Sequence, residues 1–170
     1  MNKVLAQWNK LESSEAAKEL LPCCGSTAWV EGMTKKRPFD DEASLLISSD
    51  EVWRTLRSSD WLEAFKSHPR IGESRASVST GGRSANWSEQ EQKDVAVAQD
   101  DMRHRLAEGN RAFEEKFGYI FIVRATGKSA AEILATLERR LQNGKEADLR
   151  EAAEEQRQIT QLRLKKWLKI

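Results

Sequence analysis

The sequence is organised around residues 67–73, which read Ser67-His68-Pro69-Arg70-Ile71-Gly72-Glu73. A residue that precedes proline is pushed out of the helical region, so we expect a helix to end before His68 and the backbone to turn away there. The unperturbed pKa of histidine, roughly 6.5, lets its side chain accept and donate a proton near neutral pH. His68 is therefore a candidate acid–base residue; the alternative is a surface histidine at the end of a helix.

The composition indicates an α-helical protein. The chain has 39% hydrophobic and 32% charged residues, with 28 basic and 27 acidic side chains. This balance is typical of helices that bury an apolar stripe and expose a charged face. A chain of 170 residues can bury about two-thirds of the surface of its unfolded state, which is enough for a core. We therefore expect an all-α fold in which residues 1–170 form a single compact multi-helix domain.

Charge and hydropathy exclude several classes of partner. A net charge of +1 gives no bulk attraction to nucleic acid or to an acidic membrane. No run approaches the roughly 18 apolar residues of a membrane span, and the first residues lack the hydrophobic stretch of a signal peptide. We expect a cytoplasmic protein. The only two cysteines, Cys23 and Cys24, are adjacent and have no ligand-spaced neighbours, so we expect free thiols and no metal.

Helical spacing and capping residues predict most of the elements. The expected helices cover about 2–9, Ser14 to a break at Pro22, 42–56 after Asp41, about 61–66 after Asp60, 88–106, 111–117 after a bend at Gly109-Asn110, 130–142 after the Ser129-x-x-Glu132 capping box, and 146–167.

A long polar loop is expected at about 72–87, because that stretch is rich in Ser, Gly and Arg and cannot bury itself. Ser88-x-x-Glu91 then fits a capping box that begins a helix. Glu91 shares an apolar stripe with Val95, Ala98 and Met102, which makes its carboxylate a candidate neighbour of His68. The capping box alone also accounts for Glu91. The second histidine, His104, is assigned to the solvated face of this helix.

Tyr119-Ile120-Phe121-Ile122-Val123 is the only β-branched and aromatic run. We expect a short extended segment at about 119–124, because the chain has no second such run to pair with it. Its backbone N–H and C=O groups need partners, which can be a polar ligand, water or side chains. In the last helix, Arg163 falls among the apolar residues Ile159, Leu162 and Trp167. Its guanidinium should pair with a carboxylate or an anionic ligand, or else reach water along its stem.

Several of these motifs, in this order, resemble those of the 2-oxo-4-hydroxy-4-carboxy-5-ureidoimidazoline (OHCU) decarboxylase family, bacterial type. They are His68-Pro69-Arg70-Ile71-Gly72, Ser88-x-x-Glu91-Gln92, Glu108-Gly109-Asn110, Phe117-Gly118, Phe121-Ile122-Val123-Arg124-Ala125 and Leu162-Arg163-Leu164. The resemblance implies an all-helical homodimer without a cofactor that decarboxylates OHCU, a small anionic substrate, to (S)-allantoin in urate degradation. It implies catalytic roles for His68 and Glu91, and a substrate site lined by Pro69, Ser88, Gln92, Arg163 and the backbone of Tyr119, Ile120, Phe121, Ile122 and Val123.

Two other classes of function remain open at this stage. A helical interaction module would use the 72–87 loop to bind a partner and would expose an apolar patch. A nucleic-acid-binding protein would need a basic stripe. The enzyme hypothesis instead predicts that His68, Glu91 and Arg163 share one pocket.

Overall fold

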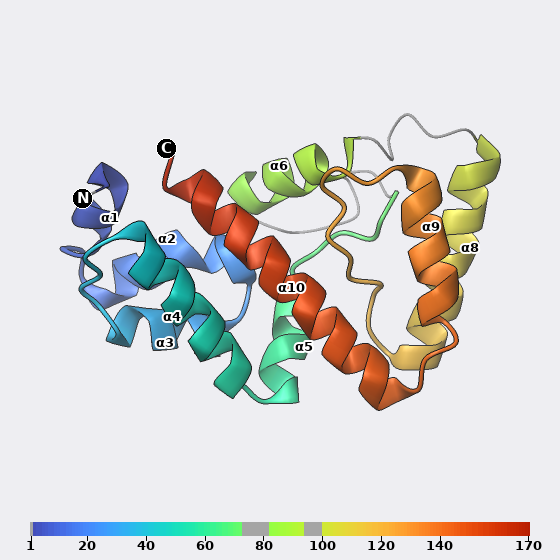
Figure 1. The fold of residues 1–170 in the computed structure, drawn as a ribbon, viewed down its shortest axis with the longest axis horizontal. Helices are drawn as coiled ribbons and strands as arrows, with labels where there is room; N and C mark the ends of the chain where they lie inside the picture. The colour runs from blue at the N-terminus through green and yellow to red at the C-terminus, as the bar shows by residue number, and fades with distance from the viewer. Residues whose placement is uncertain (1, 73–81, 94–99) are drawn as a thin grey trace. The chain divides into compact units, whose positions relative to one another are not determined.

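The computed structural model describes residues 2–72, 82–93 and 100–170, and its regular secondary structure in these ranges is entirely helical (Figure 1). This confirms the all-α class. The helices are α1 Lys3–Trp8, α2 Ser13–Cys24, α3 Thr27–Lys35, α4 Glu42–Thr55, α5 Ser58–Lys66, α6 Gly82–Glu91, α8 Asp100–Phe117, α9 Ala130–Arg140 and α10 Lys145–Trp167. Within these ranges, no helix combines the length and the apolar character that crossing a bilayer requires.

The chain divides into two compact units. That residues 1–170 form a single domain therefore stays a prediction. The first unit contains the residues up to Ala64 together with Arg157–Ile170, and the second contains Phe65–Gln156. Helix α10 contributes its first turns to the second unit and its last turns to the first.

The first unit is built on buried aromatic side chains. The ring of Trp8 packs edge-on against Trp167 at 5.8 Å and stacks with Phe39 at 6.1 Å. On the polar side, Arg157 of α10 donates to Asp50 of α4 at 2.8 Å. Helix α4 begins with the capping residue predicted from the sequence, Asp41, whose carboxylate accepts the N–H of the third helical residue.

The core of the second unit lies between α8, α9 and the segment that joins them. Its buried members include Leu106, Phe113, Phe117, Phe121, Val123, Ile133, Leu134 and Leu137. Helix α9 begins with the predicted capping box, in which Ser129 and Glu132 exchange side-chain and backbone hydrogen bonds. The segment after Gly118 carries no regular secondary structure from 120 to 125, as an extended run without a pairing partner should.

The prediction of a polar loop at 72–87 is wrong for the last residues of that range. Residues 82–87 are helical and belong to α6, while 73–81 lie outside the described residues. Ser88 and Glu91 therefore lie in the last turns of a helix and not in a capping box at its start. Helix formation is explained by burial of Ser84, Trp87 and Ser88, which are three and four residues apart. Val95 and Ala98, on the expected stripe of Glu91, lie outside the described ranges.

The bend expected at Gly109-Asn110 is also wrong, because α8 runs through both residues. A Cβ atom on Gly109 would lie 2.5 Å from Cδ2 of Leu137, so the missing side chain lets α8 approach α9 closely. The two helices lie side by side in Figure 1. Asn110 is buried, and its Nδ2 donates to the carbonyl of Ile71 at 2.8 Å. Both residues are explained by packing and not by a turn.

Two expected helix ends differ by a few residues. Helix α2 starts at Ser13 and continues past Pro22 to Cys24, where Gly25 ends it in a left-handed conformation with φ 87°. Helix α5 starts at Ser58, and Asp60 lies in its first turn, where the carboxylate accepts the N–H of Arg57 at 3.0 Å. Asp60 thus keeps a role at the start of its helix, whereas Ser14 and Pro22 lie inside α2, which has no side-chain hydrogen bond at its N-cap.

Candidate functional site

His68 lies directly after α5, where the sequence predicted a helix end. Its N–H donates to the carbonyl of Phe65 at 3.2 Å, and Pro69 then directs the chain away. The imidazole is half-buried, and its Nε2 lies 2.6 Å from Oε1 of Gln156. Gln156 belongs to α10 and is completely buried. His68 is therefore held against a buried amide and is not a surface histidine. By contrast, the side chain of His104 is 71% exposed beside Glu108, as predicted.

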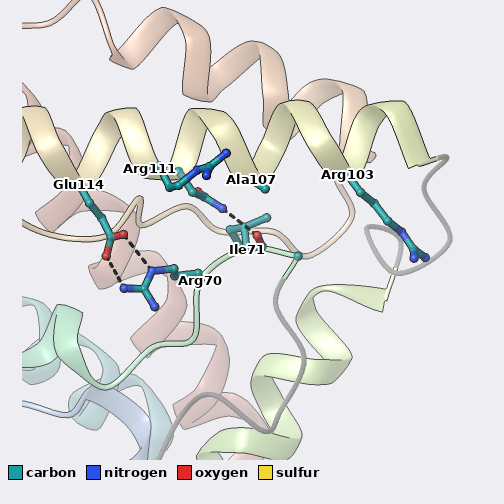
Figure 2. Close-up of a pocket in the computed structure, with 8 residues that line it drawn as sticks. Arg70, Ile71, Arg103, Ala107, Arg111 and Glu114 are labelled. Atoms are coloured by element: carbon teal, nitrogen blue, oxygen red, sulfur yellow. Dashed lines mark hydrogen bonds and ion pairs between the residues drawn. The ribbon is translucent and has the colours of Figure 1, made fainter.

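The residues after His68 are fixed to α8 and to Gln92. Arg70 forms an ion pair with Glu114 of α8, through two contacts of 2.9 Å (Figure 2). Ile71 is buried, and its carbonyl accepts from Asn110. Gly72 adopts φ 84°, and its N–H donates to Oε1 of Gln92 at 3.1 Å. Gln92 thus contacts the backbone of the same run that carries His68.

A pocket of about 440 Å³ lies beside this run. It is lined by Arg70, Ile71, Gly72, Arg103, Ala107, Asn110, Arg111 and Glu114. Arg103, Ala107 and Arg111 come from one face of α8, with the small alanine between the two arginines (Figure 2). None of the site residues expected from the sequence lines this pocket, although it borders the segment that follows Pro69.

The extended segment finds side-chain partners for several of its polar groups. The carbonyl of Ile122 accepts from Arg140 of α9, and the N–H of Arg124 donates to Glu155 of α10 at 2.6 Å. Phe121, Ile122 and Val123 are buried, while Tyr119 and Ile120 are partly exposed. Of the alternatives left open by the sequence, side-chain partners therefore account for these two backbone groups.

A buried ion pair between Arg140 and Asp148 supports that segment and was not predicted. Two nitrogens of Arg140 contact the two oxygens of Asp148 at 2.9 and 3.1 Å, and both side chains are 0% exposed. Asp148 also accepts the O–H of Tyr119 at 2.7 Å. The available signal was the position of Arg140 three residues after Leu137, on the buried face of α9.

Burial and the hydrogen bond to Asp148 both raise the pKa of Tyr119 above its ordinary value of 10.0. The phenol is therefore neutral at physiological pH and acts as a hydrogen-bond donor. This assigns its side chain to the support of the buried carboxylate.

Arg163 is completely buried in the first unit, so the alternative in which it reaches water is wrong. Its Nη1 donates to the carbonyl of Pro22 at 3.4 Å. Close to it, burial raises the pKa of the Cys24 thiol to about 12, against the opposing effects of several neighbours that include the Arg163 guanidinium. Cys24 is therefore a protonated, inert thiol at neutral pH. Neither Cys23 nor Cys24 forms a disulfide, as predicted.

The predicted site residues fall in different parts of the chain. His68, Pro69, Gln92 and the 119–123 segment belong to the second unit, together with the half-buried Glu91 and the buried Ser88 of α6. Arg163 belongs to the first unit. The convergence of His68, Glu91 and Arg163 in one pocket stays a prediction. Gln156 and Glu155, which contact His68 and Arg124, were missed because amides and helix-surface glutamates carry no distinctive sequence signal.

Comparison with known proteins places the chain in a family. The family model of OHCU decarboxylase matches residues 9–165. The uric acid degradation bifunctional protein TTL of Arabidopsis thaliana is 36% identical over 145 residues, which are 85% of this chain and 44% of that protein. The uric acid degradation bifunctional protein of Bacillus sp. (strain TB-90) is 28% identical over 163 residues, which are 94% and 31%. The chain thus spans less than half the length of these two curated relatives.

A solved structure agrees with these sequence relationships. The crystal structure of an OHCU decarboxylase in the presence of (S)-allantoin matches with a TM-score of 0.77 and 31% identity, over 89% of this chain and 98% of that one. The family model covers most of the chain, and the fold is shared over 89% of it. The chain therefore belongs to the OHCU decarboxylase family.

Proposed function

We propose that this chain decarboxylates OHCU to (S)-allantoin in urate degradation, as a carboxy-lyase that needs no cofactor. The proposal rests on family membership and on one observation, the placement of His68 against the buried Gln156 at 2.6 Å. A half-buried imidazole held at a helix end is suited to proton transfer with a bound ligand.

The chemistry explains why side chains are sufficient. When CO₂ leaves, the electron pair of the broken carbon–carbon bond moves into the neighbouring imine of the substrate ring, whose nitrogen takes up a proton from the solvent. Many decarboxylases use a cofactor for that purpose; here the substrate accepts the electrons itself. The hydroxyl group on the same carbon then loses its proton and becomes the ring carbonyl, and the neighbouring carbon receives a proton on one face. The protein has to orient the carboxylate, exclude water and move protons.

In this proposal His68 is the general acid/base that acts on the hydroxyl or carboxylate region of the substrate. Glu91 orients His68 or accepts from the ring N–H groups. Pro69, Ser88, Gln92 and Arg163 bind the substrate together with the backbone of Tyr119, Ile120, Phe121, Ile122 and Val123. Backbone groups of that segment that are not used by Arg140 and Glu155 are suited to the ureido and carbonyl groups of the substrate.

The interaction-module alternative predicted an apolar surface patch. Among the described residues, the large apolar side chains that are exposed are Leu21, Ile47 and Ile170, which come from separate elements. Single exposed side chains of this kind are ordinary in soluble domains and do not favour a docking surface. We also propose that the protein is cytoplasmic and forms a homodimer; light scattering of the purified protein can test the dimer.

The activity is tested by adding the protein to freshly generated OHCU and following the circular dichroism of (S)-allantoin. The expected result is faster appearance of the (S)-enantiomer than in the uncatalysed reaction. His68→Asn should lower the rate about 10²–10⁴-fold, the loss typical of general acid–base catalysis. His104→Asn is the matched control and should keep full activity, because its side chain is exposed. Normal turnover by His68→Asn would show that His68 is not the acid/base.

A further inference from the structure

We infer that Gln156 is a positioning residue, which holds His68 as the neutral tautomer with its proton on Nε2 and makes Nδ1 the basic atom. The expected change in kcat rests on the proposed function, whereas the expected tautomer of His68 does not. It assigns a role to a residue outside the set of expected site residues, and it names the atom of His68 that takes the proton from the substrate.

The geometry determines which nitrogen carries the hydrogen. Oε1 of Gln156 lies 2.6 Å from Nε2 of His68, within hydrogen-bonding distance. An amide oxygen only accepts hydrogen bonds, and a neutral imidazole carries one N–H. Nε2 must therefore be the protonated nitrogen, and the lone pair lies on Nδ1. Because the side chain of Gln156 is 0% exposed, the amide is shielded from water that could compete for Nε2.

The helix that carries Gln156 is itself fixed in the second unit. The preceding residue, Glu155, accepts the N–H of Arg124 at 2.6 Å. Two turns earlier, Asp148 of the same helix is held by the buried Arg140 and by Tyr119. One turn of α10 thus fixes both the imidazole and the backbone of the segment predicted to line the substrate. A rigid element of this kind can hold a side chain in one orientation.

The amide of Gln156 suits a neutral, basic imidazole at His68 better than a carboxylate at position 156 would. A glutamate at this position would stabilise the positively charged imidazolium and leave less of the neutral base at neutral pH. Gln156 orients the ring through the same bond without adding a negative charge. Of the two roles proposed for Glu91, this inference therefore requires the second, in which its carboxylate accepts from the ring N–H groups of the substrate. Nδ1 can then take the proton of the substrate hydroxyl as CO₂ leaves, and the resulting imidazolium can return a proton to the ring system.

The chain allows a direct test, because it contains only two histidines. In a His104→Asn background, a protein with ¹⁵N-labelled histidine reports on His68 alone. We expect a protonated-type Nε2 resonance and an unprotonated-type Nδ1 resonance in the neutral form. Gln156→Leu should shift both resonances toward a mixture of tautomers. It should also lower kcat with little change in KM, on the order of 10–100-fold if the loss resembles that of a group that orients a metal-ligating histidine.

Two further variants separate positioning from a general effect on the fold. Gln158→Leu makes the same change two residues along α10 and should leave both resonances and kcat unchanged. Gln156→Glu retains an acceptor, so it should preserve the protonated Nε2 while it moves the pH at which the rate is half-maximal upward. A wild-type Nδ1–H tautomer, or equal losses in Gln156→Leu and Gln158→Leu, would overturn the inference.

The spectrum needs no substrate, so it is independent of the proposed function. If the wild-type protein failed to accelerate (S)-allantoin formation but showed the Nε2–H tautomer and lost it in Gln156→Leu, the proposed reaction would be wrong and the positioning role would stand. If turnover were normal and the tautomer did not respond to the change at Gln156, the proposed reaction would stand and the positioning role would be wrong.

Discussion

Two arginine–carboxylate pairs in the second unit have the same two-point geometry but differ in their exposure to water. Arg140 contacts Asp148 at 2.9 and 3.1 Å, and neither side chain has any exposed surface. Arg70 contacts Glu114 at 2.9 Å through two nitrogens, with side chains that are 41% and 27% exposed. The first pair supports the 119–125 segment, and the second orients an arginine beside a pocket.

The buried pair belongs to a network in which each charge has several partners. Arg140 also donates to the carbonyl of Ile122, and its guanidinium lies over the rings of Phe113 and Phe121, at 5.3 and 5.0 Å from their centres. Such contacts offset the cost of removing the charges from water. The exposed pair needs no such support, because water screens it. Equal geometry therefore does not imply equal contributions to stability.

The largest expected effect comes from breaking the buried pair. Asp148→Ala leaves the Arg140 guanidinium buried without its carboxylate, so we expect the free energy of unfolding to fall by about 3–5 kcal/mol in urea titrations. Glu146→Ala is the control on the same helix, because Glu146 is exposed and forms an ion pair with Arg150, which lies one turn away on the surface. It should change the free energy by less than about 1 kcal/mol. Similar losses in the two variants would contradict the role of the buried network.

The second largest loss of stability is expected from a substitution that pushes α8 and α9 apart near the Arg140–Asp148 network. Gly109→Ala places a Cβ atom 2.5 Å from Cδ2 of Leu137, a buried residue one turn before Arg140. Overpacking of this kind costs about 1–3 kcal/mol of unfolding free energy. In a Leu137→Ala background the clash is gone, and Gly109→Ala should then be neutral or stabilising, because alanine favours a helix by about 0.5–1 kcal/mol over glycine. A destabilising effect that persists there would contradict the close approach.

A smaller effect is expected from Tyr119, the only tyrosine in the chain. Its folded-state pKa is raised above 10.0, so its contribution to stability is complete at lower pH and is lost as the pH rises from about that value toward the folded-state pKa. Tyrosinate absorbance should appear well above pH 10 in the native protein and near pH 10 in urea. Tyr119→Phe should cost about 1 kcal/mol at neutral pH. Ionisation of native Tyr119 at the same pH as in urea would contradict its bond to Asp148.

Residues whose role follows from their immediate neighbours were predictable from the sequence. The end of α5 before His68 follows from Pro69, and the start of α9 follows from Ser129. The apolar residues around Arg163 left its burial as one of two alternatives, of which the structure shows burial. These predictions use rules that act within one or two helical turns.

Features that depend on contacts between elements could not be predicted in the same way. Helix α6 carries one large buried side chain, Trp87, so its composition resembles that of a loop. The partners of Arg140 and His68 lie 8 and 88 residues away, on α10. Gly109 resembles a helix breaker until Leu137 is placed against it. In each case, packing between helices overrides local propensity.

The smallest effect is expected from the exposed pair, which completes the comparison. Glu114→Ala removes the carboxylate partner of Arg70, but both side chains reach water, so the free energy of unfolding should fall by less than about 1 kcal/mol. Added salt should reduce this difference in unfolding free energy between the wild type and the variant, because mobile ions screen the attraction between exposed charges. Urea titrations of the wild type and the variant at low and high salt provide the measurement. A loss as large as that in Asp148→Ala, and independent of salt, would mean that geometry and not burial determines the strength of such pairs in this fold.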